Sequence, residues 1–443
     1  MEMENKNYLV VGLGKTGIET LKFLARRGFN ARGTDISSKS SLNINEIDSL
    51  TDSGIKIEFG SHSESFLEWA DNLIISPGVS INTPYLVKAK ELKKNIVSEI
   101  EFATGFIKTP IIAITGSNGK TTTTTLISEI LTCSGFNIFT GGNIGTPLIT
   151  IVEEADDYDY IVLETSSFQL QATDKFRPYI SIFLNISPNH LDHHLDLEEY
   201  FQSKTNIFKN QTSDDWAIIN SGDDTIKKYS LNIKPKIISF GKKTENENIL
   251  LSGNIIEFRN EKYNLSSIKL IGGHNLDNAM CAIAAAKIAG CEKKVIEDTI
   301  MDFKPLPHRI EYIGKHRGVN VYNDSKSTSP GATLKALDSI SPPIILLAGG
   351  KDKGTDYKIL VGPLNKKVKH LVLFGEAKKR MKEQLEMSVD TTIANSLEEA
   401  VERAFSNSKE DDSILLSPAC SSFDMFSSYE ERGEVFKKIV QNF

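Results

Sequence analysis

Ile111-Ile-Ala-Ile-Thr-Gly-Ser-Asn-Gly-Lys-Thr-Thr-Thr123 is the stretch from which the fold of this chain can be worked out. Its first four residues are apolar, as in a strand buried on both faces, and a glycine-containing turn separates them from a segment with helical periodicity that runs toward Cys133. In a strand–turn–helix unit of this kind, backbone N–H groups and the helix dipole point at one anion, and glycine lets the backbone approach it. The stretch therefore predicts an α/β domain with a phosphate site at the end of a strand.

The turn itself predicts a site for a nucleoside triphosphate. Lys120 would reach the outer phosphates, and the hydroxyl of Thr121 would bind Mg²⁺. The spacing departs from the standard Walker pattern, because Ile114 stands where that pattern has its first glycine, so an ordinary strand–turn–helix loop stays open as the alternative. The residues expected to contact the nucleotide here are Gly116, Ser117, Asn118, Gly119, Lys120, Thr121 and Thr122.

Length and composition are those of a soluble protein with several domains. At 443 residues the chain is too long for one core and suggests about three domains. A net charge of -7 without a basic block gives no reason to expect a nucleic acid or membrane partner. The acidic start is unlike a signal peptide, and no apolar run reaches the length of a membrane span, so we expect a cytoplasmic protein. The cysteines have neither zinc-ligand nor disulfide-framework spacing: Cys133, Cys281, Cys291 and Cys420.

A second glycine-rich turn lies near the start of the chain. An apolar strand, Tyr8–Val11, leads into Gly12-Leu-Gly-Lys-Thr-Gly17 and a helical segment to Arg27, and the acid Asp35 follows. This spacing is typical of a dinucleotide-binding unit, but the same turn also receives other pyrophosphates, such as that of a UDP-sugar. Together with the apolar segment Leu73–Gly78, it predicts a doubly wound domain that extends to about residue 96.

Two further strands are predicted in the central part of the chain, Tyr160–Glu164 and Ile180–Asn185. Glu164, at the carboxyl end of the first strand, is the natural second anchor for Mg²⁺ beside a phosphate loop. His190 lies just beyond the second strand, where a metal ligand and a hydrogen-bonded structural histidine are equally good interpretations. The run Asp192-His-His194 is interpreted as helix-cap and surface groups.

Lys204 is an unusual residue for its position. If Glu198–Phe208 is helical, Lys204 lies on the apolar face, together with Tyr200, Phe201, Ile207 and Phe208. A lone lysine in such a place usually extends its amine to solvent. If it is desolvated instead, its pKa falls and it becomes a neutral, reactive amine.

After a proline-containing linker, Phe303–Arg309, the alternation of strands and helices begins again. Four apolar segments predict a third parallel sheet: Val319–Tyr322, Pro343–Leu347, His370–Phe374 and Ser413–Leu416. Before the linker, the sequence predicts small antiparallel strands from about residue 237 to 270 and an alanine-rich helix over Ala279–Ala289.

Three polar loops would follow strands of this third sheet, beginning at Asn323, Gly349 and Ser417. Because the carboxyl ends of parallel strands share an edge, we expect these loops to form one binding site. Two of the loops contain cations, which suits an anionic substrate such as a carboxylate. Cys420 has no base beside it in the sequence and is interpreted as a buried small residue.

Taken together, these motifs resemble those of the Mur ligases of peptidoglycan synthesis over essentially the whole chain. Within that family, the glycine turn at Gly12, the segment Leu306–Arg309 and the ending Leu416–Asp424 are most similar to those of the members that add D-glutamate. The motifs that carry the resemblance are Thr115–Thr122, Glu164–Leu170, Asn185–His194, Gly273–Asn278, Leu306–Arg309 and Asp324–Lys326.

The resemblance implies three α/β domains: a Rossmann-like N-terminal domain (1–98) that binds the UDP substrate, a central P-loop ATPase-type domain (99–305) that binds ATP, and a Rossmann-like C-terminal domain (306–443) that binds the amino acid. It also implies an ATP-dependent amide ligase that uses UDP-N-acetylmuramoyl-L-alanine, D-glutamate and two Mg²⁺ ions, and that acts as a monomer. ATP would phosphorylate the carboxylate of the first substrate, and the amine of D-glutamate would attack the acyl phosphate.

The same resemblance assigns residues to each ligand. Thr121 and Glu164 would bind one Mg²⁺, and His190 with a carbamylated Lys204 would bind the other; with Lys120 these side chains would carry catalysis. The further ATP contacts would be Asn275, Arg309, Asp324 and Lys326. The contacts to the UDP substrate would be Gly14, Lys15, Thr16, Asp35, Ser37, Gly78 and Asn143. The contacts to D-glutamate would be Thr328, Lys353, Ser422, Phe423 and Tyr429.

Two positions depart from the family pattern. Ile36 and Ser37 follow Asp35 where an arginine is usual, so the uridine diphosphate must be held differently, and Asn189 replaces the acid that usually precedes the histidine. Three alternatives stay open at this point. They are another amino-acid-adding Mur ligase or a folylpolyglutamate synthase, a NAD-dependent dehydrogenase built on Gly12–Gly17, and a non-catalytic, nucleotide-gated interaction protein.

Overall fold

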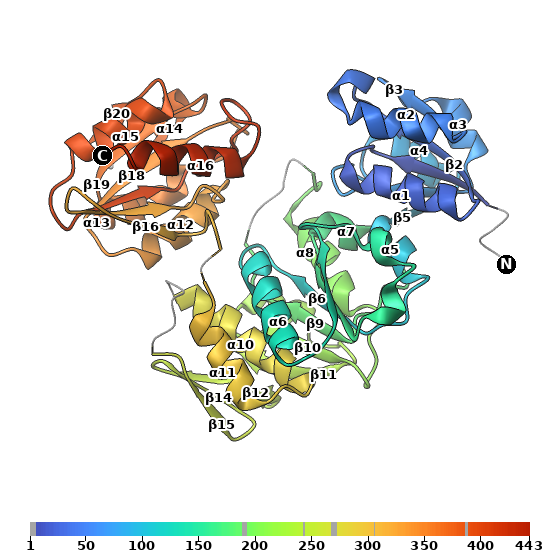
Figure 1. Ribbon diagram of the computed structural model, residues 1–443, viewed down its shortest axis with the longest axis horizontal. Coiled ribbons are helices and arrows are strands. Elements are labelled where there is room, and N and C mark those ends of the chain that lie inside the picture. The colour runs from blue at the N-terminus through green and yellow to red at the C-terminus, as the bar shows by residue number, and fades with distance from the viewer. Residues whose placement is uncertain (1–5, 188–192, 242–243, 267–272, 305, 386–388) are drawn as a thin grey trace. The chain divides into compact units, whose positions relative to one another are not determined.

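The computed structural model describes residues 6–187, 193–241, 244–266, 273–304, 306–385 and 389–443 (Figure 1). The described parts of the chain form two compact units, one from Met1–Ser266 with Asp277–Ile300 and the other from Ser267–Leu276 with Met301–Phe443. The first unit contains two parallel sheets and a small antiparallel one, and the second unit contains a mixed sheet. The predicted α/β fold class is confirmed, while the predicted domain boundaries after residues 98 and 305 stay predictions.

The first sheet has the strand order β3-β2-β1-β4-β5, and its neighbouring strands are parallel. Its strands are β1 (Asn7–Val11), β2 (Asn30–Asp35), β3 (Lys56–Phe59), β4 (Asn72–Ile75) and β5 (Asn95–Ser98). The helices between them are α1 (Lys15–Arg26), α2 (Ile44–Asp52), α3 (Glu64–Trp69) and α4 (Pro84–Glu91). Because β1 lies between β2 and β4, the strand order reverses there, and doubly wound sheets bind ligands at the carboxyl end of such a strand.

The second sheet has the order β12-β11-β10-β9-β6-β8-β7, again with parallel neighbours. Its strands are β6 (Ile111–Thr115), β7 (Ile138–Gly142), β8 (Tyr160–Glu164), β9 (Ile180–Phe183), β10 (Trp216–Asn220), β11 (Lys236–Phe240) and β12 (Glu247–Asn248). The helices of this part of the chain are α5 (Glu99–Thr104), α6 (Lys120–Cys133), α7 (Ser167–Gln171), α8 (Leu197–Thr205), α9 (Asp224–Tyr229), α10 (Gly273–Ile288) and α11 (Lys293–Asp302). Strand β6, which precedes the phosphate loop, lies between β9 and β8, so the predicted central groups share one sheet edge.

One prediction for this region is partly wrong. Small antiparallel strands do occur, at β13 (Leu250–Ser252), β14 (Ile255–Phe258) and β15 (Glu261–Asn264). Lys236–Phe240, at the start of the predicted run, is instead the parallel strand β11. Because β11 follows β10 through helix α9, the connection is a crossover between parallel strands and not a hairpin.

The second unit is built on a six-stranded sheet of order β16-β17-β21-β18-β19-β20. β16 and β17 pair antiparallel, and the other neighbours pair parallel. The strands are β16 (Glu311–His316), β17 (Val319–Asn323), β18 (Ile344–Gly349), β19 (Val368–Phe374), β20 (Thr391–Ile393) and β21 (Ser413–Leu416), and the helices are α12 (Pro330–Ser339), α13 (Val361–Lys367), α14 (Lys378–Leu385), α15 (Leu397–Ser406) and α16 (Tyr429–Val440). Since β17, β21 and β18 are neighbours, the three predicted polar loops follow adjacent strands.

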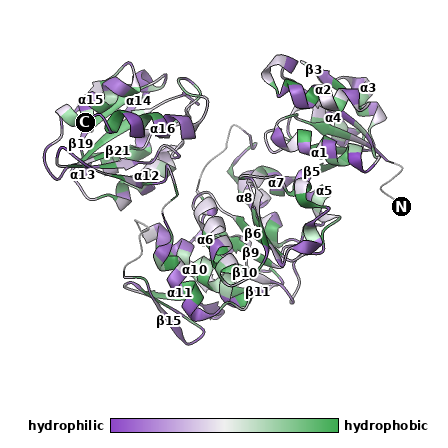
Figure 2. Cartoon of the chain, viewed as in Figure 1, coloured by the Kyte–Doolittle hydropathy of each residue, from purple (hydrophilic) through white to green (hydrophobic). Residues whose placement is uncertain are grey.

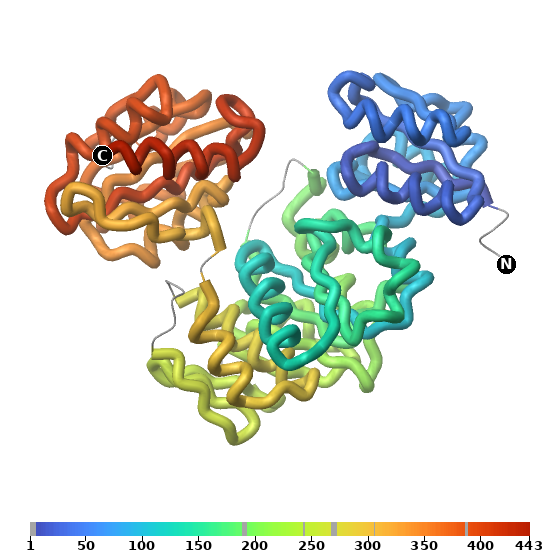
Figure 3. Tube along the Cα trace, viewed as in Figure 1, coloured from blue at the N-terminus to red at the C-terminus, as the bar shows by residue number. Residues whose placement is uncertain are grey.

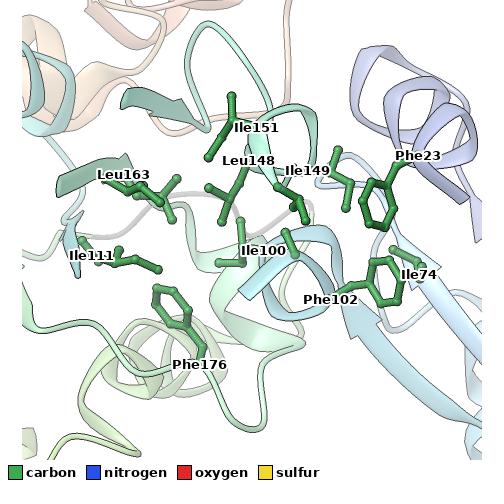
Figure 4. Packing of buried hydrophobic residues seen from close by; sticks show 14 of the residues in the cluster. Phe23, Ile74, Ile100, Phe102, Ile111, Leu148, Ile149, Ile151, Leu163 and Phe176 are labelled. Atoms are coloured by element: carbon green, nitrogen blue, oxygen red, sulfur yellow. The ribbon is translucent and has the colours of Figure 1, made fainter. Parts of the chain in front are cut away.

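Apolar residues gather on the strands, as Figure 2 shows by colour. In the first unit one apolar cluster includes residues of both domains: Phe23 and Ile74 belong to the first, and Phe102, Ile149 and Phe176 lie beyond β5 (Figure 4). The chain itself passes from one sheet to the other through β5 and α5 (Figure 3). This shared core joins the two parts of the first unit that carry these sheets.

Two further features bear on where ligands could bind. A cavity of about 980 Å³ is lined by residues at the amino ends of strands, among them Asn72, Asn95 and Ile111, and therefore lies away from the predicted ligand edge. A membrane-spanning helix would need a longer apolar run than any helix in the described part of the chain has.

Candidate active site

The phosphate loop between β6 and α6 has a fixed shape. Gly119, the residue before the helix, has a φ of 83°, and a Cβ at this position would come within 2.5 Å of the side-chain oxygen of Asn278. Asn118 is held by Asn185, which accepts the backbone N–H of Asn118 and donates to its carbonyl oxygen, both at 3.0 Å. Since glycine alone suits that φ and that space, this turn of the loop requires glycine at position 119.

Glu164, at the end of β8, connects the phosphate loop to the loop after β7. Its Oε2 accepts a hydrogen bond from the hydroxyl of Thr121 at 2.8 Å, and its Oε1 accepts one from Nδ2 of Asn143 at 2.9 Å. Hydroxyl and carboxylate oxygens are the ligands that Mg²⁺ prefers, so Thr121 and Glu164 fit the predicted metal site. Another predicted metal ligand, His190, lies outside the described residues.

Lys204 is buried and does not extend to solvent. Its side chain is 2% exposed, and its Nζ donates to the carbonyl oxygen of Gly116 at 3.1 Å and lies 5.0 Å from the ring centroid of Tyr200. The Nζ of Lys120 donates to the same carbonyl at 3.0 Å. Burial first, and then the charge of Lys120, lower the pKa of Lys204 well below its usual range, while Glu164 opposes the shift. Lys204 is therefore desolvated and does not extend its amine to solvent, whereas its reactivity stays a prediction.

The interpretation of Asp192–His194 as helix-cap and surface groups is wrong for His194. This histidine is buried, and its Nε2 lies 2.9 Å from the hydroxyl oxygen of Ser167. Burial lowers its pKa to about 4. Helix α8 is capped by Asp196, whose carboxylate accepts a backbone N–H of the first turn at 2.8 Å. The true cap lies two residues further on, which leaves His194 free to pack inward; Asp192 lies outside the described residues.

In the first domain, the glycine turn after β1 is held by Asp35. Its carboxylate accepts the backbone N–H of Leu13 at 2.6 Å and that of Ser37 at 2.7 Å. Asp35 therefore shapes the turn through backbone contacts, and it is buried. The other predicted contacts to the UDP substrate are exposed or half-buried at the carboxyl edge of this sheet: Gly14, Lys15, Thr16, Ser37 and Gly78.

Lys15 joins this edge to the central domain. Its Nζ donates to the carbonyl oxygen of Gly145 at 2.7 Å, and Gly145 belongs to the loop that carries Asn143. Lys15 and the loop of Asn143, which are both predicted to contact the UDP substrate, are thus linked although they belong to different domains.

In the second unit the three polar loops meet as predicted. The backbone N–H of Lys351 donates to the carbonyl oxygen of Ser421 at 2.9 Å. Asp324, in the loop after β17, accepts the hydroxyl of Ser417 at 2.8 Å. Burial raises the pKa of Asp324 to about 6. This carboxylate is buried and hydrogen-bonded to a neighbouring loop. Within the described residues, its contacts therefore hold the loops together.

The remaining predicted residues of this unit differ in exposure. Lys326 lies with its Nζ 3.7 Å from the ring centroid of Tyr429, although the resemblance gives these two residues different ligands. Ser422 is buried and Phe423 is largely exposed. The other predicted contacts are exposed at Lys353, half-buried at Thr328 and Arg309, and buried at Asn275. As Cys420 is also buried, with a pKa that burial raises to about 11, its interpretation as a small core residue holds.

Arg432 of α16, which sequence reasoning missed, binds two of these loops at once. Its guanidinium is fully buried. Nε donates to the hydroxyl of Ser325 at 2.9 Å and Nη2 to the carbonyl of the same residue at 2.8 Å. Nη1 donates to the carbonyl oxygens of Cys420 at 3.1 Å and Ser421 at 3.2 Å. One side chain thus fixes the loops after β17 and β21 relative to each other.

Replacing Arg432 by lysine is expected to destabilise the protein, because one ammonium group cannot reach acceptors in both loops. Each buried carbonyl left without a donor should cost about 1–3 kcal/mol. Unfolding in urea measures the change. The control is Arg403→Lys, at a partly exposed arginine paired with Glu399 in α15, where a change within about 0.5 kcal/mol is expected. Equal stability of Arg432→Lys and the wild type would contradict this account of the loops.

Comparison with protein families identifies all three regions. Residues 6–98 match the model of the Mur ligase MurD-like N-terminal domain, residues 114–286 that of the Mur ligase middle domain, and residues 308–420 that of the Mur ligase glutamate ligase domain.

Solved structures show the same fold at low sequence identity. The pseudomurein peptide ligase type C from Methanothermus fervidus is 20% identical, with a TM-score of 0.62, over 99% of this chain and 100% of that one. The UDP-N-acetylmuramate-alanine ligase from Thermotoga maritima is 18% identical, with a TM-score of 0.58, over 99% of this chain and 100% of that one. The predicted three-domain α/β architecture is confirmed by these neighbours.

Curated relatives match over nearly their full lengths. The UDP-N-acetylmuramoylalanine–D-glutamate ligase of Geotalea uraniireducens is 42% identical over 447 residues, which cover 100% of this chain and 98% of the relative. The protein of the same name from Thermoanaerobacter sp. is 41% identical over 452 residues, 99% of each chain. The resemblance that the motifs indicate is confirmed, and the chain belongs to the Mur ligase family.

Proposed function

We propose that this chain is an ATP-dependent amide ligase that joins D-glutamate to UDP-N-acetylmuramoyl-L-alanine in the synthesis of peptidoglycan precursors. Relatives more than 40% identical over the full length carry the name of that activity. The structural observation that carries the proposal is the group around Glu164, whose two oxygens hold Thr121 of the phosphate loop and Asn143 of the neighbouring loop. A dehydrogenase built on the Gly12–Gly17 turn would leave this group, and the buried Lys204, without a role.

The proposed reaction has two steps. A carboxylate oxygen of the alanyl residue attacks the γ-phosphorus of ATP, ADP leaves, and an acyl phosphate forms. The amine of D-glutamate then attacks the acyl carbon, inorganic phosphate leaves, and the new amide nitrogen loses a proton. Phosphoryl transfer depends mainly on positioning and on neutralising charge, which suits Lys120 and the backbone N–H groups of the phosphate loop.

Magnesium is part of this proposal. Thr121 and Glu164 would hold one ion, and His190 with a carbamylated Lys204 would hold the other. Bound there, Mg²⁺ would neutralise phosphate charge during the transfer. The burial of Lys204 supports the carbamate, because only a neutral amine adds carbon dioxide, and the addition turns the amine into an anionic oxygen ligand.

The other ligands are assigned to the two sheet edges already described. The UDP substrate is proposed to contact Gly14, Lys15, Thr16, Asp35, Ser37, Gly78 and Asn143. ATP is proposed to contact, besides the phosphate loop, Asn275, Arg309, Asp324 and Lys326. D-Glutamate is proposed to contact Thr328, Lys353, Ser422, Phe423 and Tyr429, with the exposed ammonium of Lys353 facing a free carboxylate. We also propose that the enzyme is cytoplasmic and acts as a monomer. Its mass in solution would test the oligomeric state.

The deciding experiment measures phosphate release from ATP with Mg²⁺ and UDP-N-acetylmuramoyl-L-alanine. D-Glutamate is compared with L-glutamate, L-alanine, glycine and diamino acids. We expect release that depends strictly on D-glutamate. Release with a different amino acid would keep the ligase and contradict the substrate assignment, and no release with any of them would overturn the proposed function.

A further inference from the structure

Glu99 is a buried carboxylic acid that the proposed reaction does not use. It is the first residue of α5, the helix through which the chain enters the second domain, and it is 1% exposed. Beside it, Ile100 of the same helix belongs to one apolar cluster with Leu148 and Ile149 (Figure 4). Burying a carboxyl group among apolar side chains costs free energy. The hydrogen-bond partners of Glu99 therefore indicate its structural role.

The carboxyl group of Glu99 binds one short segment of backbone. Oε1 of Glu99 accepts the N–H of Ile149 at 2.6 Å, and the neighbouring backbone of Leu148 also favours the charged carboxyl group. These two residues begin the 3₁₀ helix Leu148–Ile151, where the first N–H groups have no partner within the helix. Oε2 is buried without a hydrogen-bond partner among the described residues. Glu99 therefore fixes the start of this segment.

The segment follows directly on the loop that carries Asn143. The loop closes through the N–H of Gly142 and the carbonyl oxygen of Thr146 at 2.9 Å, and the N–H of Asn143 donates to the carbonyl oxygen of Glu164 at 2.9 Å. Gly142 has a φ of 97°, and a Cβ there would come within 2.5 Å of the same carbonyl. One end of the loop is thus pressed against β8, and the other end is the segment that Glu99 holds.

We propose that Glu99 is a positioning residue for the ligase reaction. By fixing Leu148 and Ile149, it sets the place of the preceding loop. It thereby sets the place of Asn143 at Glu164. The inference rests on the proposed function, because Asn143 and Glu164 face the UDP substrate and Mg²⁺ only if that function is correct.

A second side chain holds the same loop from the other domain. Lys15 of α1 donates to the carbonyl oxygen of Gly145, between Asn143 and the segment that Glu99 binds. Lys15 is exposed, whereas Glu99 is buried, so the two contacts differ in strength. The buried contact of Glu99 is therefore expected to be the stronger of the two.

The kinetic test compares Glu99 with Glu101. Glu101 lies in the same helix, and its carboxylate likewise accepts backbone N–H groups, those of Lys175 and Phe176 at 2.8 and 2.9 Å, which are remote in sequence from Asn143. We expect Glu99→Ala and Glu99→Asp to raise KM for UDP-N-acetylmuramoyl-L-alanine about tenfold and to lower kcat. KM for D-glutamate should change less than about twofold. Glu99→Gln, which keeps an acceptor oxygen, should stay near wild-type kinetics, and Glu101→Ala should leave both KM values near the wild type.

A double-mutant cycle tests whether Glu99 acts through Asn143. In an Asn143→Ala background, Glu99→Ala should change KM for the UDP substrate by less than about twofold. Additive effects would overturn the proposal, as would equal KM changes in Glu99→Ala and Glu101→Ala. Should Glu99→Ala fail to fold, Glu99→Asp carries the same comparison, because its carboxylate is one methylene too short.

Protonation provides a readout separate from catalysis. Burial raises the pKa of Glu99 to about 7 from an ordinary value of 4.5, the backbone of Ile149 and Leu148 opposes the shift, and no charged side chain among the described residues contributes. With the folded pKa above the unfolded one, this group's contribution to stability is fully present below about pH 4.5 and is lost as the pH rises through about 7. The Tm of the wild type relative to Glu99→Gln should therefore fall across that window.

The outcomes separate this inference from the proposed function. Unchanged KM in Glu99→Ala and Glu99→Asp, in an enzyme whose wild type is active, would overturn the positioning role alone. A pH-independent Tm difference would overturn the buried contact on which that role depends. A wild type without D-glutamate-dependent phosphate release would overturn the proposed function, while the Tm comparison would still report on Glu99.

Discussion

Replacement of Lys204 by alanine is expected to lower kcat by about 10³-fold, and replacement by arginine should lower it as much. Alanine offers no ligand to the second metal site, and arginine stays protonated and cannot form a carbamate. Acetate or formate should restore part of the rate of Lys204→Ala, because a small carboxylate can occupy the vacated space and present an oxygen to Mg²⁺. Phosphate release with and without these anions measures both effects.

Stability separates a catalytic from a structural loss at this position. Lys204→Met keeps the apolar stem and removes a buried amine, so its Tm should not fall below that of the wild type although the variant is inactive. The matched control is Lys209→Ala, at an exposed lysine shortly after the same helix whose Nζ lies 3.0 Å from Asp174. Its kcat should stay near the wild type. Wild-type rates in Lys204→Ala or Lys204→Arg would contradict the carbamate.

Glu164→Gln should lower kcat by about 10²–10³-fold and raise the Mg²⁺ concentration needed for half-maximal rate. The glutamine keeps the shape of the side chain, but it lacks the charge, and its amide group would face Thr121 or Asn143 with a second donor. Phosphate release measured across a Mg²⁺ titration gives both numbers.

The control for this prediction is Glu154→Gln, at an exposed glutamate in the same domain. It removes the same charge without touching the phosphate loop, so neither kcat nor the Mg²⁺ requirement should change. If Glu164→Gln behaved like Glu154→Gln, Glu164 would not be a metal ligand, and its contacts to Thr121 and Asn143 would be structural only.

The parts of the fold that the sequence predicts well are those whose causes are local. The apolar runs Ile111–Ile114, Ile161–Leu163 and Ser413–Leu416 read as buried strands because every side chain in them is covered. The phosphate loop could be predicted because its strand, turn and helix are contiguous. Lys204 could be singled out because its apolar neighbours recur at helical spacing, and the structure buries it on that face.

The residues that sequence reasoning missed have partners far away in the chain. Arg432 binds Ser325, 107 residues earlier, and Glu99 binds Ile149, 50 residues later. Most of these contacts are with backbone groups. Because every residue has such groups, no pattern of side chains in the sequence predicts these contacts. A usable signal did exist for Arg432, because Phe436 and Val440 follow it at intervals of four on the buried face of α16. It is the same signal that drew attention to Lys204.

The bonds of Arg432 have a consequence for how the choice of amino acid could change. Because one guanidinium holds the loops after β17 and β21, a loop taken alone from a relative that uses another amino acid would arrive with carbonyls in the wrong places. Productive chimeras should therefore exchange both loops together with α16. The two loops and α16, which carry most of the proposed D-glutamate contacts, would then evolve as one unit. A new amino-acid specificity would arise by replacing this unit or by altering side chains within it.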